Sequence, residues 1–98
     1  MSVLMNFSMF PISKAESLSP YVARVLSCIG SKEFPYQLTS MGTIVETSTL
    51  SEALQLIDMA YKELENECSR VYVTVSLDIR KGSRGRIKAK VKSVEDKA

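Results

Sequence analysis

The spacing of apolar residues changes repeatedly along this chain of 98 residues, and the order of the changes limits the folds open to it. Near the N-terminus, apolar side chains recur at every second position until Pro11 interrupts the run. The residues on one side are Val3, Met5, Phe7 and Met9. Alternation of this kind is typical of a strand with one buried face, so we predict a first strand over 3–10.

A first helix is predicted to begin at Ser19-Pro20. The Ser19 hydroxyl can cap the helix, and a proline at the first helical position forgoes a hydrogen bond that no residue there can make within the helix. The apolar residues that follow at helical spacing are Val22, Val25, Leu26 and Ile29. Gly30 is expected to end the helix in the left-handed conformation.

A hairpin and a second helix come next. Tyr36–Met41 and Thr43–Thr47 indicate two strands, and Gly42 is expected to permit the tight reversal between them. Thr49-Leu50-Ser51-Glu52 has the spacing of a capping box and therefore predicts a helix start. The predicted apolar stripe of this second helix is Leu50, Ala53, Leu54, Ile57, Ala60, Tyr61 and Leu64.

The last part of the chain predicts a strand and a short basic helix. Apolar and polar residues alternate strictly over 70–79, and 87–97 combines several lysines with a thin apolar stripe. The whole chain, 1–98, is therefore predicted to be a single α+β domain with a ferredoxin-like βαββαβ order. Right-handed crossovers would give a four-stranded antiparallel sheet with both long helices on one face. The opposite face would stay open, and we expect self-association into a dimer or tetramer through that face or its edges.

Composition narrows the function classes. The chain has no histidine, its net charge is +2, and no serine or cysteine has a nearby partner resembling an activating base, so we expect no enzyme activity, no metal and no cofactor. Cys28 and Cys68 form no CxxC pair and are predicted to be reduced thiols of a cytoplasmic protein. The N-terminal segment lacks the basic region of a signal peptide and is too short and polar to span a membrane, so no membrane partner is expected.

Three segments together resemble one protein family. They are Ser17-Leu18-Ser19-Pro20-Tyr21-Val22, the run Tyr36-Gln37-Leu38-Thr39-Ser40-Met41-Gly42-Thr43-Ile44-Val45-Glu46, and the helix from Leu50 to Leu64. This combination is similar to the YkoF-like family of small thiamine-binding proteins, and Gly-Thr-x-x-Glu is its most specific part. The family usually has glycine after that glutamate, where this chain has Thr47.

The resemblance implies a non-catalytic, oligomeric protein that binds thiamine or its hydroxymethylpyrimidine portion. On matching positions it assigns ligand binding to Ser19, Thr43 and Glu46, with Gly42 between the strands. Thiamine has a cationic thiazolium and an aminopyrimidine edge that both donates and accepts hydrogen bonds, so Tyr36 is added as an aromatic surface for the cation. Thr43 and Glu46 should face opposite sides of an ideal strand. A bulge at Gly42, or a site shared between subunits, would be needed for both to touch one ligand.

Each of these residues also fits an ordinary structural role. Ser19 is, taken alone, a helix cap, Thr43 a β-branched strand residue, and Glu46 a solvated charge.

Two other function classes fit parts of the sequence. A basic C-terminal segment, with Arg80, Arg84 and several lysines, is compatible with a nucleic-acid-binding protein. No aromatic platform lies on the third strand, however, so we expect no such partner. An ACT-like regulatory module has the same element order, but its usual glycine is missing after the first strand.

Overall fold

The computed structural model describes residues 1–12, 19–82 and 85–98. Residues 13–18, between the first predicted strand and the first predicted helix, fall outside these ranges, and they include Ser17 and Leu18 of the family-like segment. Ser83 and Arg84 of the loop before the basic helix are also outside.

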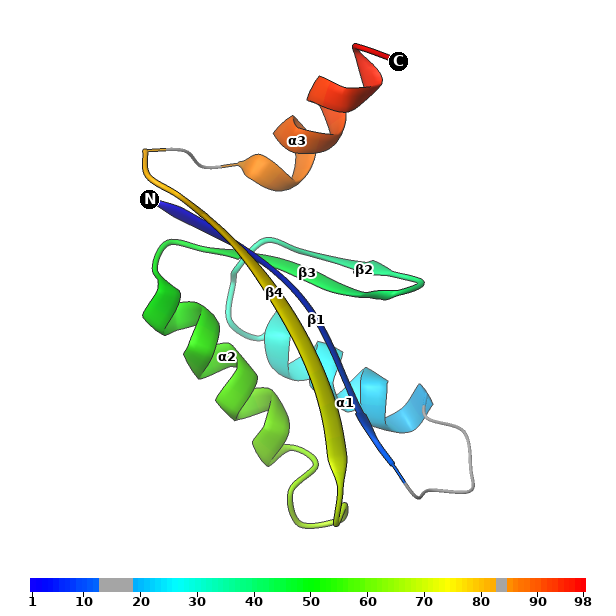
Figure 1. Ribbon diagram of the computed structural model, residues 1–98. Coiled ribbons are helices and arrows are strands. Elements are labelled where there is room, and N and C mark those ends of the chain that lie inside the picture. The colour runs from blue at the N-terminus through cyan, green and yellow to red at the C-terminus, as the bar shows by residue number, and fades with distance from the viewer. Residues whose placement is uncertain (13–18, 83–84) are drawn as a thin grey trace.

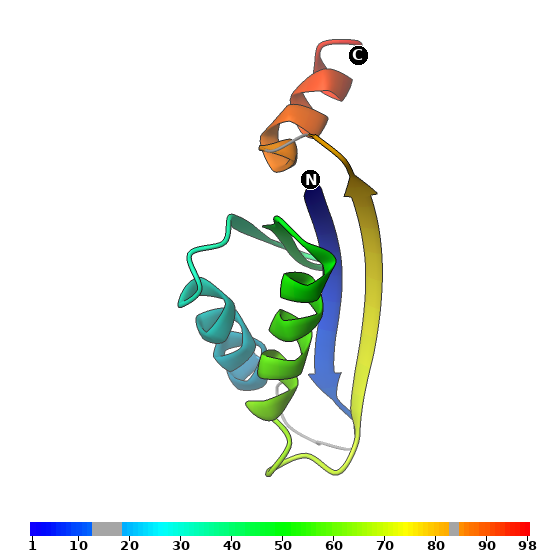
Figure 2. The same ribbon diagram turned by 90° about the vertical axis from the view of Figure 1, so that its left-hand side faces the viewer.

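The chain forms a four-stranded antiparallel sheet in the order β2-β3-β1-β4, with α1 and α2 on one face (Figures 1 and 2). In chain order the elements are β1 (Ser2–Pro11), α1 (Ser19–Gly30), β2 (Tyr36–Thr39), β3 (Gly42–Thr47), α2 (Leu50–Lys62), β4 (Val71–Arg80) and α3 (Arg86–Glu95). The predicted ferredoxin-like fold and its additional C-terminal helix are thus confirmed. Figure 2 shows α3 beyond the end of the sheet at which β1 begins and β4 ends.

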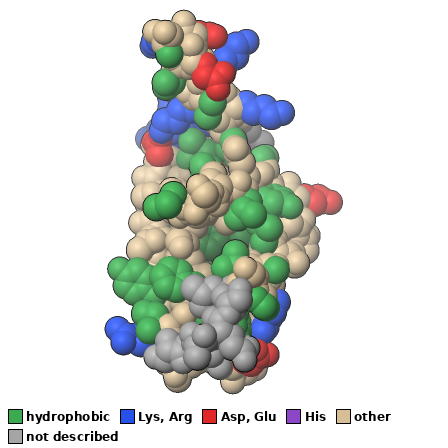
Figure 3. All heavy atoms as spheres, turned by 90° about the vertical axis from the view of Figure 1, so that its right-hand side faces the viewer, with side chains coloured by type: hydrophobic (Ala, Val, Ile, Leu, Met, Phe, Trp, Pro, Cys, Tyr) green, Lys and Arg blue, Asp and Glu red, His purple; other side chains and the backbone are tan. Residues whose placement is uncertain are grey.

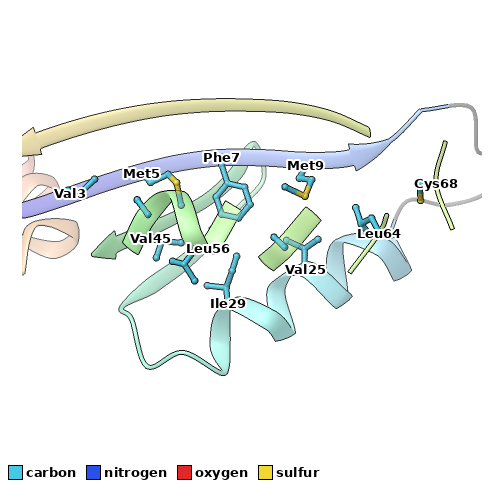
Figure 4. Close-up of a cluster of buried hydrophobic side chains, with 12 residues drawn as sticks. Val3, Met5, Phe7, Met9, Val25, Ile29, Val45, Leu56, Leu64 and Cys68 are labelled. Carbon is cyan, nitrogen blue, oxygen red and sulfur yellow. The ribbon is translucent and has the colours of Figure 1, made fainter. Parts of the chain in front are cut away.

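The core lies between β1, β3 and the two long helices. The alternating side chains of β1 that were predicted to share a face are all buried there, and Met5, Phe7 and Met9 point toward the side chains of α1 and α2 (Figure 4). Phe7 lies opposite Thr43 in the register of β1 with β3, and Met5 lies opposite Val45. Because residues paired across a sheet share a face, Thr43 and Val45 also point toward the helices.

The start of α2 was predicted correctly, but part of its stripe was wrong. Thr49 Oγ1 accepts the Glu52 amide at 3.2 Å, and Glu52 Oε1 accepts the Thr49 amide at 3.0 Å, which completes the capping box. The stripe expected to be buried includes Leu54 and Tyr61, which are exposed. The buried residues are Ala53, Leu56 and Ala60, followed by Leu64 just beyond the helix. Leu54 and Tyr61 lie on a second apolar flank of α2, one position along the chain from the buried Ala53 and Ala60. Periodicity alone does not show which of the two flanks packs on the sheet.

Two glycines act through close packing rather than through a left-handed backbone. Neither Gly30 nor Gly42 has a positive φ, and the residue after α1 that takes one is Glu33, at 63°. A Cβ on Gly30 would lie 3.3 Å from the Tyr36 hydroxyl. A Cβ on Gly42 would lie 2.8 Å from Asn6 Oδ1 and 2.9 Å from the Phe7 carbonyl oxygen. Gly42 is therefore required because β1 and β3 approach closely at this point.

β4 is an edge strand with an uncovered apolar row. The residues of this row, 38–46% exposed, are Val73, Val75, Leu77 and Ile79. Their register with Met5 and Phe7 places them on the helix side of the sheet, whereas Tyr72 and Asp78 are on the open face. Both helices pack mainly on β1 and β3, so this row lies outside their cover. The exposed apolar surface of β4 is thus concentrated at an edge of the sheet, beside the helices.

Candidate functional site

The five candidate residues do not form one cluster. The pairing of β3 with β1 and β2 is continuous and contains no bulge at Gly42, so Thr43 faces the helices and Glu46 faces the opposite side. Gly42 and Thr43 line a hollow beside the hairpin, whereas Tyr36 and Glu46 line a groove beneath α3. We call these the hairpin hollow and the α3 groove.

The hairpin hollow is a notch of about 200 Å³ between β1, α1 and the end of the β2–β3 hairpin. Its walls are β1 from Phe7 to Phe10, Val22 and Val25 of α1, and the hairpin from Leu38 to Thr43. None of these lining residues carries a charge. Figure 3 shows the side of the molecule at which the hairpin ends, where hydrophobic side chains surround a central hollow and most Lys and Arg side chains lie toward α3 or the periphery.

Thr43 is a buried residue of the hollow whose hydroxyl has no hydrogen-bond partner among the described residues. Thr43 is 7% exposed, and within the described residues its hydroxyl makes no hydrogen bond. Thr47, two positions along the same strand, differs because its hydroxyl donates to the Thr49 carbonyl oxygen at 2.8 Å. Among the described residues no fully buried side-chain oxygen or nitrogen lacks a partner, so the Thr43 hydroxyl must keep some access to the hollow. It is therefore suited to donate to, or accept from, a bound molecule.

Backbone groups add to the polar lining. β1 pairs with β3 from Val3 to Phe7, so from Ser8 onward the edge of β1 that faces the hairpin has no strand partner among the described residues. Thr39 Oγ1 donates to the Gly42 carbonyl oxygen at 2.9 Å and accepts the Met41 amide at 3.2 Å, which fixes the turn above this edge. The notch therefore combines apolar walls with a strand edge and a hydroxyl, an arrangement suited to a small flat ring with polar atoms on its rim.

Glu46 is engaged by the protein itself. It is 6% exposed, and its Oε2 accepts the Ser2 hydroxyl at 2.6 Å while its Oε1 accepts the Arg86 amide at 3.0 Å. Arg86 is the first residue of α3, and Gly85 before it offers no side-chain cap. The Glu46 carboxylate thus caps α3 from a distant strand and complements the positive end of the helix dipole. Its negative charge is used at this position to hold α3.

Two basic residues of the C-terminal segment join the same network. The buried Arg86 guanidinium donates to the Ser2 and Asp78 carbonyl oxygens at 3.2 and 3.1 Å, and it forms an ion pair with the Asp78 carboxylate at 2.5 Å. Lys90 contacts the same carboxylate at 2.5 Å. The Lys90 ammonium, followed by the Arg86 guanidinium, holds the pKa of Asp78 below its usual value. These two cations therefore bind α3 to the sheet, which reduces the basic surface available to a phosphate backbone.

The other two candidates lie apart from the hairpin hollow. The ring of Tyr36 lies close to Gly30 at the end of α1, and Tyr36 lines the α3 groove. Ser19 begins α1 and does not line the hollow, but it is one turn before Val22 and so lies near the same side of the helix. Sequence reasoning missed the contribution of β1 from Ser8 to Phe10. Its only signal was that β1 is longer than the hairpin strands that pair with it.

Neither a metal centre nor a membrane span is found in the described part of the chain. In the ranges 1–12, 19–82 and 85–98, no three His, Cys, Asp or Glu side chains come together as metal ligands. None of the described helices is long and apolar enough to cross a bilayer.

The fold and the hollow define a small ferredoxin-like α+β protein with a ring-sized notch. Residues 5–95 match the family model described as thiamine-binding protein. A UPF0045 protein of Methanothermobacter thermautotrophicus is 32% identical over 82 residues, covering 83% of each chain. A UPF0045 protein of Mycobacterium tuberculosis is 27% identical over 95 residues, covering 97% of this chain and 93% of the relative. The chain belongs to the thiamine-binding protein family, as its resemblance to YkoF-like proteins implied.

Solved structures agree on the fold. A hypothetical protein from Methanocaldococcus jannaschii superposes with a TM-score of 0.86 at 26% identity, covering 97% of both chains. A Thermotoga maritima protein, described provisionally as a thiamine biosynthesis/salvage protein, gives a TM-score of 0.82 at 20% identity, covering 96% of this chain and 99% of that one. The second similarity supports the ferredoxin-like fold alone.

Proposed function

We propose that this protein binds thiamine, without converting it, by holding the aminopyrimidine ring in the hairpin hollow. The observation that carries the proposal is the hydroxyl of the buried Thr43, which has no partner among the described residues, in a notch lined by the part of β1 that extends beyond its pairing with β3. An aminopyrimidine edge offers both donors and acceptors, so it can bond to a hydroxyl and to strand backbone groups at once.

Size and charge decide which part of the ligand enters. Pockets that enclose drug-sized molecules usually measure about 300–1,000 Å³, so a hollow of about 200 Å³ suits one ring rather than all of thiamine. The uncharged lining favours the neutral pyrimidine over the permanently cationic thiazolium. The thiazolium then stays at the mouth of the hollow, in contact with solvent.

The proposal gives the candidate residues different roles. Gly42 and Thr43 contact the ligand, and Ser19 lies near the rim of the hollow. Glu46 positions α3, so its charge is already engaged away from the hollow. Tyr36 and Glu46 would reach the same ligand only if a second subunit supplied them.

Self-association is part of the proposal, and β4 is the surface we assign to it. An edge strand of ten residues presents unpaired backbone groups, and its row Val73, Val75, Leu77 and Ile79 remains exposed beside them. Pairing with β4 of another copy continues the sheet. It satisfies the unpaired backbone groups of the edge and covers part of the exposed apolar row. Burying the exposed part of each side chain contributes about 1 kcal/mol, as expected for roughly half of a large apolar side chain.

Calorimetric titration with separate halves of the ligand tests the proposed function. Thiamine and 4-amino-5-hydroxymethyl-2-methylpyrimidine should both bind, whereas the hydroxyethylthiazolium half should not. Binding of the thiazolium half alone, or of neither thiamine nor the pyrimidine, would contradict the proposal.

A further inference from the structure

Met41 is an apolar side chain at the end of the hairpin that lies largely in solvent. It belongs to the two-residue turn between β2 and β3 and is 84% exposed, more than any other large apolar side chain in the described part of the chain. Of the other methionines, Met5 and Met9 are buried in the core, Met59 is partly buried, and Met1 is 47% exposed. Met41 therefore does not share the usual role of methionine as a filler of gaps in the core.

Met41 lies at the boundary between two hollows. It lines the hairpin hollow, and it also lines a smaller hollow of about 150 Å³ with Asn6 and Thr74, whose side chains lie on the open sheet face. The two hollows have Phe7, Ser8 and Met41 in common. From Ser8 onward this edge of β1 has no strand partner among the described residues, so no paired strand closes the space between the hollows. The Met41 side chain is therefore the part of the hairpin that separates the hairpin hollow from the open face.

The backbone beneath this side chain is held in place, whereas the side chain itself can turn. Thr39 Oγ1 accepts the Met41 amide at 3.2 Å and donates to the Gly42 carbonyl oxygen at 2.9 Å, so one hydroxyl fixes both sides of the turn. The unbranched methionine side chain rotates about three bonds. It can therefore move toward or away from the hairpin hollow while the residues that line the hollow stay where they are.

We propose that Met41 covers the hairpin hollow, that its thioether packs on the bound aminopyrimidine, and that oxidation of this thioether weakens binding. The inference rests on the proposed function, because it concerns the same hollow. A methionine sulfur makes favourable contacts with an aromatic ring and adapts to its shape. A peroxide transfers one oxygen atom to this sulfur, which gives methionine sulfoxide, and hydrogen peroxide is itself reduced to water. The sulfoxide oxygen is a hydrogen-bond acceptor that loses its water when it packs on a ring, so the oxidised side chain covers the hollow less favourably.

Oxidation before a calorimetric titration tests the effect on affinity. Brief treatment of the native protein with hydrogen peroxide should raise its Kd for 4-amino-5-hydroxymethyl-2-methylpyrimidine by about 2- to 12-fold, as expected for the loss of one sulfur–aromatic contact. Methionine sulfoxide reductase with dithiothreitol should then restore the original Kd. Met41→Leu has no thioether at this position, so its Kd should be the same before and after treatment. Met1→Leu removes the other exposed methionine and should respond to peroxide as the native protein does.

The rate of oxidation gives a second readout, which reports directly on cover by the ligand. By peptide mass spectrometry, a saturating concentration of the pyrimidine should slow sulfoxide formation at Met41 and leave the rate at Met1 unchanged.

Two results would overturn the inference while the proposed function stands. One is an equal rate of oxidation at Met41 with and without the pyrimidine. The other is an equal loss of affinity in the native protein and Met41→Leu, which would assign the effect to another group such as the free Cys28 thiol. If the untreated native protein binds neither thiamine nor the pyrimidine, the proposed function is refuted, and this inference with it.

Discussion

Thr43 and Thr47 allow the proposed binding site to be separated from the stability of the fold. Both threonines are on β3, both are buried on the helix side of the sheet, and each can be replaced by valine of nearly the same shape. They differ in one respect, since the Thr47 hydroxyl donates to Thr49 and the Thr43 hydroxyl has no partner among the described residues.

The expected magnitudes follow from this difference. An intramolecular hydrogen bond contributes about 0.5–1.5 kcal/mol net, so Thr47→Val should lower the free energy of unfolding by about that amount. Thr43→Val removes no internal bond and should leave that free energy unchanged or raise it slightly. If Thr43 bonds to the ligand, its loss should raise the Kd for thiamine by about 2- to 12-fold, which corresponds to the same 0.5–1.5 kcal/mol.

Urea unfolding followed by circular dichroism gives the first quantity, and isothermal titration calorimetry gives the second. We expect two opposite results: Thr43→Val changes binding and not stability, and Thr47→Val changes stability and not binding. The proposed role of Thr43 is refuted if Thr43→Val destabilises the protein as much as Thr47→Val does and leaves the thiamine affinity unchanged.

Three further predictions address the surroundings of the site. Gly42→Ala should lower the free energy of unfolding in urea by about 1–3 kcal/mol, because its Cβ would crowd the Phe7 carbonyl oxygen, whereas Ser40→Ala on the exposed turn should have little effect. Glu46→Ala should lower it by about 1–3 kcal/mol and speed amide exchange in α3, because Ser2 and the Arg86 amide lose their acceptor; unchanged exchange in α3 would exclude the capping role. The lowered pKa of Asp78 means that its contribution is present above about pH 4, its unfolded value, and is lost as pH falls through the folded pKa. Protection of the α3 amides, taken relative to the intrinsic exchange rate at each pH, should therefore fall at acidic pH in the native protein and less so in Asp78→Asn; identical protection profiles would show that Asp78 does not hold the helix.

The fold was predictable because its signals are local. Alternation in β1 and β4 and the capping box at Thr49 each depend on neighbouring residues, and each corresponds to an element of the structure. The errors arose where packing between elements determines which residues are buried. The periodicity of α2 includes Leu54, but the position of the helix on the sheet buries Leu56 instead.

The candidate site was only partly predictable for the same reason. The opposite orientation of Thr43 and Glu46 follows from strand alternation, and the register confirms it. No spacing in the sequence predicts that Glu46 caps a helix that begins forty residues later. The contact depends on the position of Arg86 in space, which is set by where β4 ends. The free edge of β1 likewise depends on the relative lengths of β1 and the hairpin.

Chemical-shift mapping of the ¹⁵N-labelled protein during a thiamine titration tests the assignment of the ligand to the hairpin hollow most directly. We predict that the largest shifts occur around this hollow, in Phe7–Phe10, in Val22 and Val25, and in Leu38–Thr43. Shifts concentrated instead in Tyr36, Glu46 and the groove-lining residues of α3 would place the ligand beneath α3 and contradict the assignment.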